Sequence, residues 1–152
     1  ACTGGILLFL HADTLLPDGA LAEIQDAIRG DNHWGRFDVN FDSKRRPFRM
    51  IASMMNWRSR VSGIATGDQA MFMTRAAFDL VNGFDEIPLM EDIAMSKKLN
   101  TIAPPVCLES QVTTAARRWE QKGVWRTVVL MWWLRLAYWV GVSPEKLARW
   151  YR

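Results

Sequence analysis

The chain has 152 residues, of which 49% are hydrophobic and 23% are charged, and its formal net charge is +3. This length and composition predict one globular domain and exclude a low-complexity chain. The net charge is too small to favour a nucleic-acid partner. Cys2 and Cys107 lie far apart without the spacing of a metal site, and no signal peptide is visible, so the sequence favours a reducing cytosol.

The stretch from Gly5 to Pro17 carries the first candidate site. Its apolar run, Ile6 to Leu10, predicts a buried strand in the centre of a parallel or mixed sheet. Ligands of open α/β sheets bind beyond the carboxyl ends of such strands, so Asp13 is placed to hold a divalent cation and, through it, phosphates. His11 is a second candidate ligand, because neutral imidazole binds Mn²⁺ well. The alternatives are a structural imidazole for His11 and an Asx-type turn cap for Asp13.

The next elements follow from hydrophobic spacing. Pro17 suits the first turn of a helix whose apolar residues are Leu21, Ile24 and Ile28, with Gly30 as its end. The range 34–41 alternates and predicts a half-buried strand. The sequence then predicts a helix over 46–61, a strand over 67–73, a helix over 75–81, a helix over 91–99 and strands over 106–108 and 112–116.

The helix over 46–61 has two different faces. The apolar spacing places Phe48, Ile51 and Met55 on the inward face, and it extends to Met54 with a poorer fit to the helical period. The other face carries Arg45, Arg49, Arg58 and Arg60. The arginines form either a solvated face or a basic rim that attracts a phosphate-bearing acceptor or an anionic membrane.

The range 124–140 is apolar on nearly all sides and is interrupted by Arg126 and Arg135. It is too short and too charged to predict a membrane-spanning helix. It is either a core helix, a homodimer helix or an in-plane membrane helix with Trp125, Trp132, Trp133 and Trp139 as anchors. The eight tryptophans of the chain allow the same two interpretations, an aromatic core or an exposed aromatic surface. Ser143 and Pro144 begin a final helix after Gly141.

Glu91 and Asp92 follow a loop at a predicted helix N-terminus, where the helix dipole favours carboxylates. Such a pair is either a helix-capping pair or a catalytic base with its neighbour. The Gly67-Asp68-Gln69 segment is either an ordinary strand entry or a backbone approach to a sugar, with Asp68 bonding its hydroxyls.

Three blocks of the sequence resemble the family 2 glycosyltransferases of GT-A fold. They are the apolar strand ending in His11-Ala12-Asp13, in place of Asp-x-Asp, the block 82–86 (NGFDE) and the block 89–92 (LMED). The ending, residues 117–152, resembles one small bacterial subgroup. The resemblance implies a partial GT-A fold: a mixed sheet flanked by helices, followed by C-terminal amphipathic helices. It also implies that the chain, 1–152, is a single domain comprising a catalytic part (1–116) and a helical extension (117–152), and lacks the N-terminal nucleotide-binding unit of the family.

The resemblance further implies inverting, metal-dependent transfer of a sugar from a nucleotide-diphosphate sugar to an acceptor hydroxyl, although the fragment alone is expected to have little activity. Asp13 and His11 would bind Mn²⁺ or Mg²⁺, Asp92 would be the base, and Glu91 would orient it. Asp68, Gln69, Arg118 and Trp119 would contact substrate. Arg117-Arg118-Trp119 resembles the Gln-x-x-Arg-Trp element of processive polymerases, but Ala115 replaces its Gln, which argues against processivity.

The sequence leaves two rival functions open. Haloacid dehalogenase-type phosphatases also follow an apolar strand with acids and Thr, but His11 stands where their nucleophilic Asp would be. A non-catalytic module that binds a membrane surface or a partner through the basic and Trp-rich helices is the stronger rival. For the enzyme, the expected partners are a nucleotide-sugar donor and an acceptor whose candidates include lipid-linked compounds. The expected location is cytoplasmic, with peripheral contact at the inner face of the plasma membrane as an option.

Overall fold

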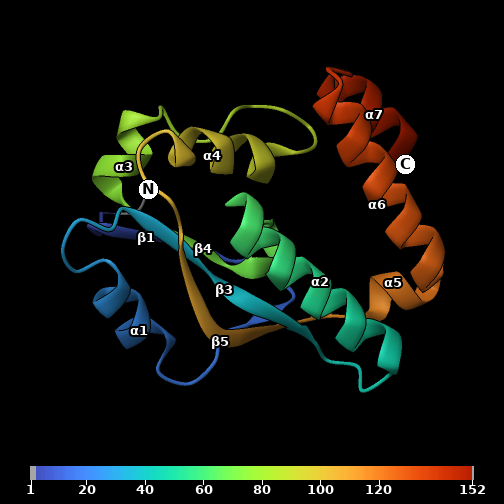
Figure 1. The fold of residues 1–152 in the computed structure, drawn as a ribbon, viewed down its shortest axis with the longest axis horizontal. Helices are drawn as coiled ribbons and strands as arrows, with labels where there is room; N and C mark the ends of the chain where they lie inside the picture. Colours follow the sequence, from blue (N-terminus) through green and yellow to red (C-terminus); the bar gives the residue numbers. More distant parts are fainter. Residues whose placement is uncertain (1–2, 152) are drawn as a thin grey trace.

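A computed structural model describes residues 3–151 of the chain. It is an α/β structure with a curled, mixed five-stranded sheet (Figure 1). The strands are β1 (Ile6–Phe9), β2 (Thr14–Leu15), β3 (Trp34–Phe41), β4 (Met71–Thr74) and β5 (Val106–Thr114), in the order β1-β4-β3-β5-β2. Only the β3–β5 pair is parallel, and the other three pairs are antiparallel. The predicted α/β class with a mixed sheet is therefore confirmed.

Seven helices and one 3-10 turn accompany the sheet in the described range. They are α1 (Ala20–Ala27), α2 (Arg46–Ser62), η1 (Gly67–Gln69), α3 (Arg75–Leu80), α4 (Glu91–Asn100), α5 (Arg117–Lys122), α6 (Val124–Trp139) and α7 (Pro144–Tyr151). The core of one face joins α3 and α4 to the sheet through residues such as Met73 and Leu99. The core of the other face joins α1 to it through Ile24 and Phe72.

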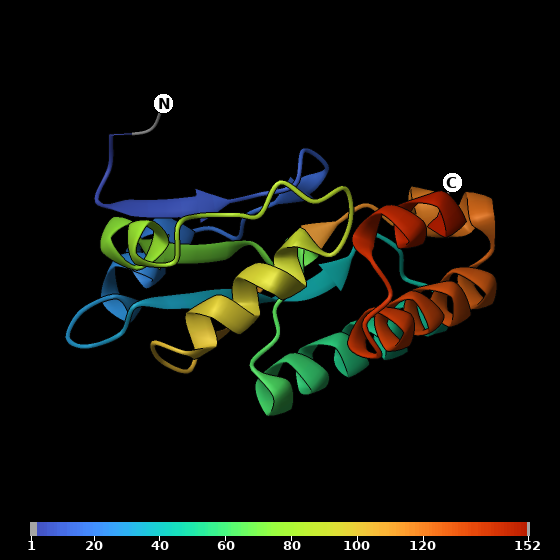
Figure 2. The ribbon, with the colours of Figure 1, turned by 90° about the horizontal axis from the view of Figure 1, so that it is seen from above.

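The three C-terminal helices follow β5 and stand at one end of the sheet (Figure 1, Figure 2). The inner side of α6, including the buried Leu134, packs against Ile93 of α4 and Leu147 of α7. Near its start, Val128 packs with the α2 residues Phe48 and Ile51. The helix α6 thus reaches both α2 and the N-terminal end of α4. Among the described residues, no helix combines the length and apolar composition needed to cross a bilayer.

The strand β3 has the predicted bounds, but it is buried on both faces instead of half-buried. Arg36 is fully buried and pairs with Asp38, which also accepts two hydrogen bonds from Arg60 of α2 at 2.9 and 3.0 Å. Asn56 of α2 completes this polar layer by bonding both the backbone N–H and the carbonyl of Val39. The alternating charges of β3 therefore face a helix and not water.

Four other predicted elements differ from the structure. The strand β1 lies at the edge of the described sheet, not in its centre, since its backbone pairs with β4 alone. Its side chains nevertheless pack on both faces of the sheet, which explains the apolar run. The helix α1 begins three residues after Pro17, following Gly19 in a left-handed conformation, and Leu21 is exposed. Residues 67–69 form a 3-10 turn instead of a strand. The two predicted strands after residue 105 are one strand, β5, with an irregularity opposite Phe37 and Asp38.

Candidate active site

The segment after β1 meets the 3-10 turn η1. His11 Nδ1 lies 3.4 Å from Asp68 Oδ1, although 57 positions separate these residues in the chain. The His11 ring lies directly against Gly67: a Cβ on Gly67 would come within 2.1 Å of His11 Nε2. No side chain larger than hydrogen fits there unless His11 moves. Gly67 is therefore what lets the His11 ring lie against the backbone in this position.

Local sequence fixes the turn that carries Asp68. Thr66 and Gln69 form a capping box around η1, in which the Gln69 carboxamide oxygen accepts the Thr66 backbone N–H at 3.2 Å. Ala70 then adopts a left-handed conformation with φ 47° and leads into β4. The result holds the half-buried Asp68 side chain on the His11 side of the turn.

Asp92 ties α4 to the same place. One carboxylate oxygen accepts the backbone N–H of Gly67 at 3.0 Å, and the other accepts that of Ile93 at 2.7 Å. The left-handed Met90, φ 70°, turns the chain into α4 immediately before this residue. The half-buried Asp92 carboxylate therefore links the start of α4 to the turn η1 through hydrogen bonds.

His11, Asp13, Asp68 and Asp92 together constitute what we call the acid cluster. Hydrogen bonding to Asp68 raises the pKa of His11 above its usual value; partial burial opposes this, while the charges of Asp68, Asp13 and Asp92 support it. All three carboxylates thus stabilise the protonated form of His11. Asp13 and Asp92, the two predicted acids, therefore both lie within electrostatic range of His11.

Two arginines that the sequence analysis did not assign to the site belong to its surroundings. Arg58 of α2 and Arg135 of α6 both interact electrostatically with Asp92, and they repel each other. Burial and the Arg135 charge lower the pKa of Arg58 to about 10. Burial also lowers the pKa of Arg135, while Asp92 and Asp68 oppose that shift. The sequence signal that could have identified Arg135 as a site residue is its charge within the largely apolar range 124–140.

The two predicted metal ligands, Asp13 and His11, differ in how open they are to a cation. Asp13 is exposed in the turn between β1 and β2, where its carboxylate is open to a cation. His11 turns Nδ1 toward Asp68 and Nε2 toward Gly67, so its nitrogens are less open. In the described residues, no group of three or more His, Cys, Asp or Glu side chains is arranged to hold a metal ion. The metal site therefore remains a prediction.

The remaining candidate residues occupy different environments. Glu91 is exposed beside Asp92. Gln69 is fully buried, and its amide bonds Thr66 and Asn56, which gives it a role in the fold. Trp119 packs edge-on against Phe41, with ring centroids 5.7 Å apart. The side chain of Arg118 lies outside the described part of the structure.

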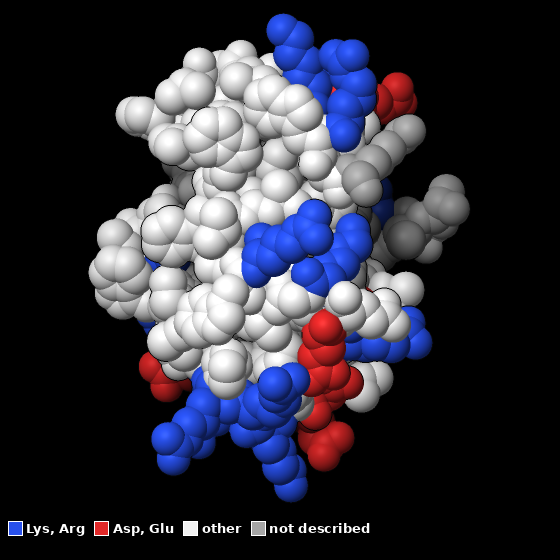
Figure 3. Space-filling model, turned by 90° about the vertical axis from the view of Figure 1, so that its right-hand side faces the viewer, with Lys and Arg blue, Asp and Glu red and all other residues white. Residues whose placement is uncertain are grey.

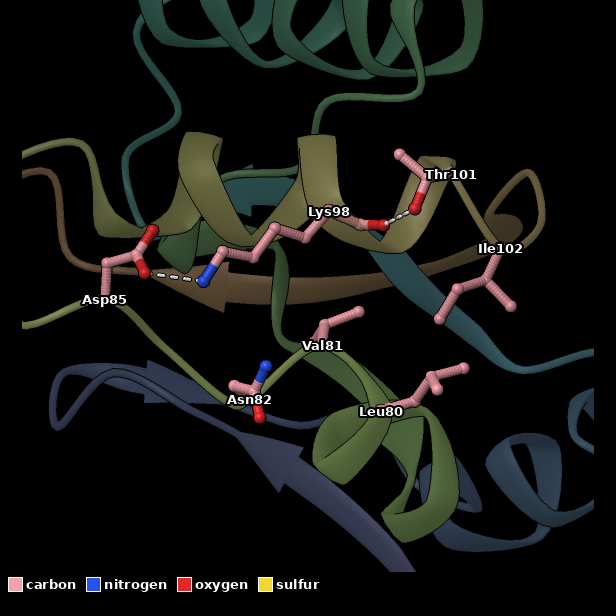
Figure 4. A pocket seen from close by; sticks show the side chains of 7 residues that line it. All are labelled: Leu80, Val81, Asn82, Asp85, Lys98, Thr101 and Ile102. Atoms are coloured by element: carbon pink, nitrogen blue, oxygen red, sulfur yellow. Dashed lines mark hydrogen bonds and ion pairs between the residues drawn. The ribbon is translucent and has the colours of Figure 1, made fainter.

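A surface pocket lies beside the C-terminal end of α4 (Figure 4). Its lining comes from α3, the following loop and the end of α4, and Lys98 bonds Asp85 across it. The acid cluster instead lies at the N-terminal end of α4. This pocket is therefore a separate feature.

Comparison with models of known families, with curated proteins and with solved structures gave no match to this chain. The functional argument therefore depends on the chemistry of the residues described above.

Proposed function

We propose that this chain carries the catalytic carboxylates of a glycosyltransferase of GT-A type, which transfers a sugar from a nucleotide-diphosphate sugar to an acceptor hydroxyl with inversion. One observation supports the proposal most: the end of β1, the turn η1 and the start of α4 bring His11, Asp68 and Asp92 together and place Asp13 within their electrostatic reach. Two of these segments, the end of β1 and the start of α4, lie in blocks that carry the resemblance, and the turn η1 does not.

Asp92 has the role of general base in this proposal. Its two backbone hydrogen bonds fix the carboxylate, and each oxygen keeps a second lone pair that can accept a proton. The acceptor oxygen attacks the anomeric carbon as its proton passes to Asp92. The bond from that carbon to the diphosphate oxygen breaks, and the nucleoside diphosphate leaves with the electron pair. Glu91, next to Asp92, would orient the acceptor.

The other side of the acid cluster would handle the donor. Asp13, exposed after β1, would bind Mn²⁺ or Mg²⁺ with help from Asp68 or His11. A bound metal would supply Lewis-acid neutralisation of the leaving diphosphate. Asp68 is half-buried and remains a candidate partner for sugar hydroxyls.

Donor binding and sugar transfer by the protein test this proposal. We expect a nucleoside diphosphate to bind only with Mn²⁺ or Mg²⁺, and Asp13→Ala to abolish this binding. Asp92→Asn should retain binding and lower transfer by about 100-fold or more, the usual contribution of a general base. Asp18→Ala, at another exposed aspartate, is the control. Transfer by Asp92→Asn at the parent rate would show that the base is assigned wrongly.

A second candidate function is supported by a separate observation. The outward side of α6 exposes a continuous apolar stripe: Trp125, Val129, Trp132, Trp133, Leu136, Trp139 and Val140. The neighbouring α2 exposes Met50, Met54, Trp57 and Val61 at helical spacing. We call these eleven residues the aromatic face. On the side of the molecule that Figure 3 shows, uncharged side chains cover a broad area, with basic side chains at its middle and edges and acidic ones toward the bottom. This face supports a module that binds a membrane surface.

A further inference from the structure

Arg58 has charged nitrogens that the protein leaves without partners. Its Nε and Nη2 atoms are buried, and neither has a hydrogen-bond partner among the described residues. Arg60, two positions further along α2, provides a contrast, since it makes two hydrogen bonds to Asp38. The same helix therefore carries one arginine with a counter-ion and one without.

Arg135 adds a second positive charge to this place. It comes from α6, and its side chain is only partly accessible. Neither Arg58 nor Arg135 takes part in an ion pair within 4.0 Å in the described part of the chain. The two guanidinium groups repel each other, and the carboxylates that attract them, Asp92 for both and Asp68 for Arg135, act from beyond that distance.

This arrangement is unfavourable in the protein alone. A buried charge without a partner is destabilising, and an arginine in a protein does not escape that cost by losing its proton. The cost disappears when an anion enters between the two side chains. Both residues remain partly exposed, so this place borders solvent.

We propose that Arg58 and Arg135 form a binding site for a phosphate or diphosphate group beside the acid cluster. A guanidinium group donates two parallel hydrogen bonds to phosphate oxygens, and two such groups from different helices suit an anion of charge −2 or more. The negative charge of Asp92 and Asp68 on one side disfavours an anion there, so the phosphate lies on the side of the arginines away from these carboxylates. Phosphate binding at this site does not depend on the proposed sugar transfer.

Isothermal titration calorimetry with pyrophosphate tests the site. We expect the parent protein to bind pyrophosphate, and Arg58→Met and Arg135→Met each to weaken binding by about tenfold or more, because each removes charge-assisted hydrogen bonds. Arg49→Met in α2 and Arg126→Met in α6 place the same substitution at exposed arginines of the same helices. These two controls should change binding by less than about twofold. Absence of binding to the parent protein, or an equal loss in the controls, would overturn the proposal.

Thermal melting without ligand provides a second, independent measurement. Arg58→Met removes a buried charge that has no partner, so its melting temperature should equal or exceed that of the parent. Pyrophosphate should then raise the melting temperature of the parent and not that of Arg58→Met. If Arg58→Met and Arg135→Met unfold or both melt more than about 5 °C below the parent, the arginines are structural ties and the proposal is wrong.

Competition distinguishes two sources of the phosphate group. If the site holds the diphosphate of a nucleotide donor, a nucleoside diphosphate with Mn²⁺ should compete with pyrophosphate and should bind less tightly to Arg58→Met. If the site holds a phosphate of the acceptor, both should bind at once, and only pyrophosphate binding should weaken in the variant. Either result supports the anion site, and each assigns it to one substrate.

Discussion

The role predicted for His11 from the sequence differs from the contacts that it makes in the structure. In the sequence it replaces the first acid of an Asp-x-Asp element and is a candidate metal ligand. In the structure its imidazole is bonded to Asp68 and lies against the backbone of Gly67. The carboxylates of the acid cluster favour its protonated form, and a protonated imidazole does not coordinate a metal. His11 is therefore also a candidate for holding Asp68 in place through its charge.

This contact predicts a pH-dependent contribution to stability. The pKa of His11 is raised in the folded protein by the hydrogen bond to Asp68, so its stabilisation is fully present below the unfolded pKa, about 6.5, and disappears as pH rises through the folded pKa. His11→Gln should lower the melting temperature at pH 5 to 6 and have less effect at pH 8 to 9. The half-exposed pair contributes about 0.5 kcal/mol, or about 1–2 °C.

Thermal melting across this pH range checks the prediction. His33→Gln, at the other histidine of the chain, controls for the substitution itself. If the melting temperatures of His11→Gln and the parent differ by the same amount at every pH, the bond to Asp68 carries no charge-dependent stabilisation.

At the scale of elements, the contact between β3 and α2 depends on charge as much as on apolar packing. Arg36 is fully buried beneath α2, and its counter-ion Asp38 is shared with Arg60. A buried pair adds little when intact, but removal of one partner leaves the other charge unpaired. The layer therefore fixes how α2 sits on the sheet, and α2 in turn carries Arg58 to its place near Asp92.

We expect Asp38→Asn to lower the free energy of unfolding by about 3 kcal/mol or more, because Arg36 then lacks its counter-ion. Urea denaturation of the parent and the variant measures this loss. Asp26→Asn, which breaks the exposed pair with Arg29, is the matched control and should cost less than about 1 kcal/mol. A loss below about 1 kcal/mol for Asp38→Asn would mean that Arg36 finds other partners or water.

The sequence predicted elements whose apolar spacing is regular, among them α2, α4, α6 and β3, with nearly the observed bounds. It did not predict that β1 is an edge strand, because apolar side chains report what covers the faces of a strand and not what pairs with its backbone. It predicted a half-buried strand over 34–41, because alternation alone does not distinguish water from a polar layer beneath a helix.

The sequence indicated the individual acids of the candidate site, but it did not indicate the contacts between them. Asp13, Asp68 and Asp92 each stand at the end of an element, which local sequence signals indicate. Their convergence around His11 depends on tertiary contacts such as the bond from Gly67 to Asp92. Arg58 was grouped with exposed arginines, since helical periodicity places it on the polar side of α2, and its partial burial depends on tertiary packing.

At the scale of the whole molecule, the aromatic face and the arginine pair belong to the same two helices. The two helices carry the partly buried Arg58 and Arg135 and also the exposed tryptophans. Neither α2 nor α6 contains Asp or Glu, and together they contain six arginines. This composition matches an anionic lipid surface, since tryptophan suits the bilayer interface and arginine attracts anionic headgroups. A membrane docked there would bring lipid-linked acceptors close to the acid cluster.

We therefore expect the protein to float with vesicles of phosphatidylcholine that contain phosphatidylglycerol, and to bind less well at high salt or without the anionic lipid. The double substitution Trp132→Ala with Trp133→Ala should weaken binding by about tenfold or more, because two large apolar side chains no longer enter the interface. Leu21→Ala with Leu80→Ala, at exposed apolar residues of α1 and α3, is the control and should leave flotation unchanged.

Two outcomes separate the interpretations of the aromatic face. If the parent dimerises without vesicles and the tryptophan substitutions abolish that dimer while flotation is absent at every lipid composition, the face is covered by a second copy of the chain. If flotation behaves as predicted but the protein shows no affinity for metal or nucleotide, the chain is a membrane-surface module and its acid cluster is structural. Flotation together with metal-dependent donor binding would join both proposals, because an enzyme held at the lipid surface by α2 and α6 keeps the start of α4 beside the membrane.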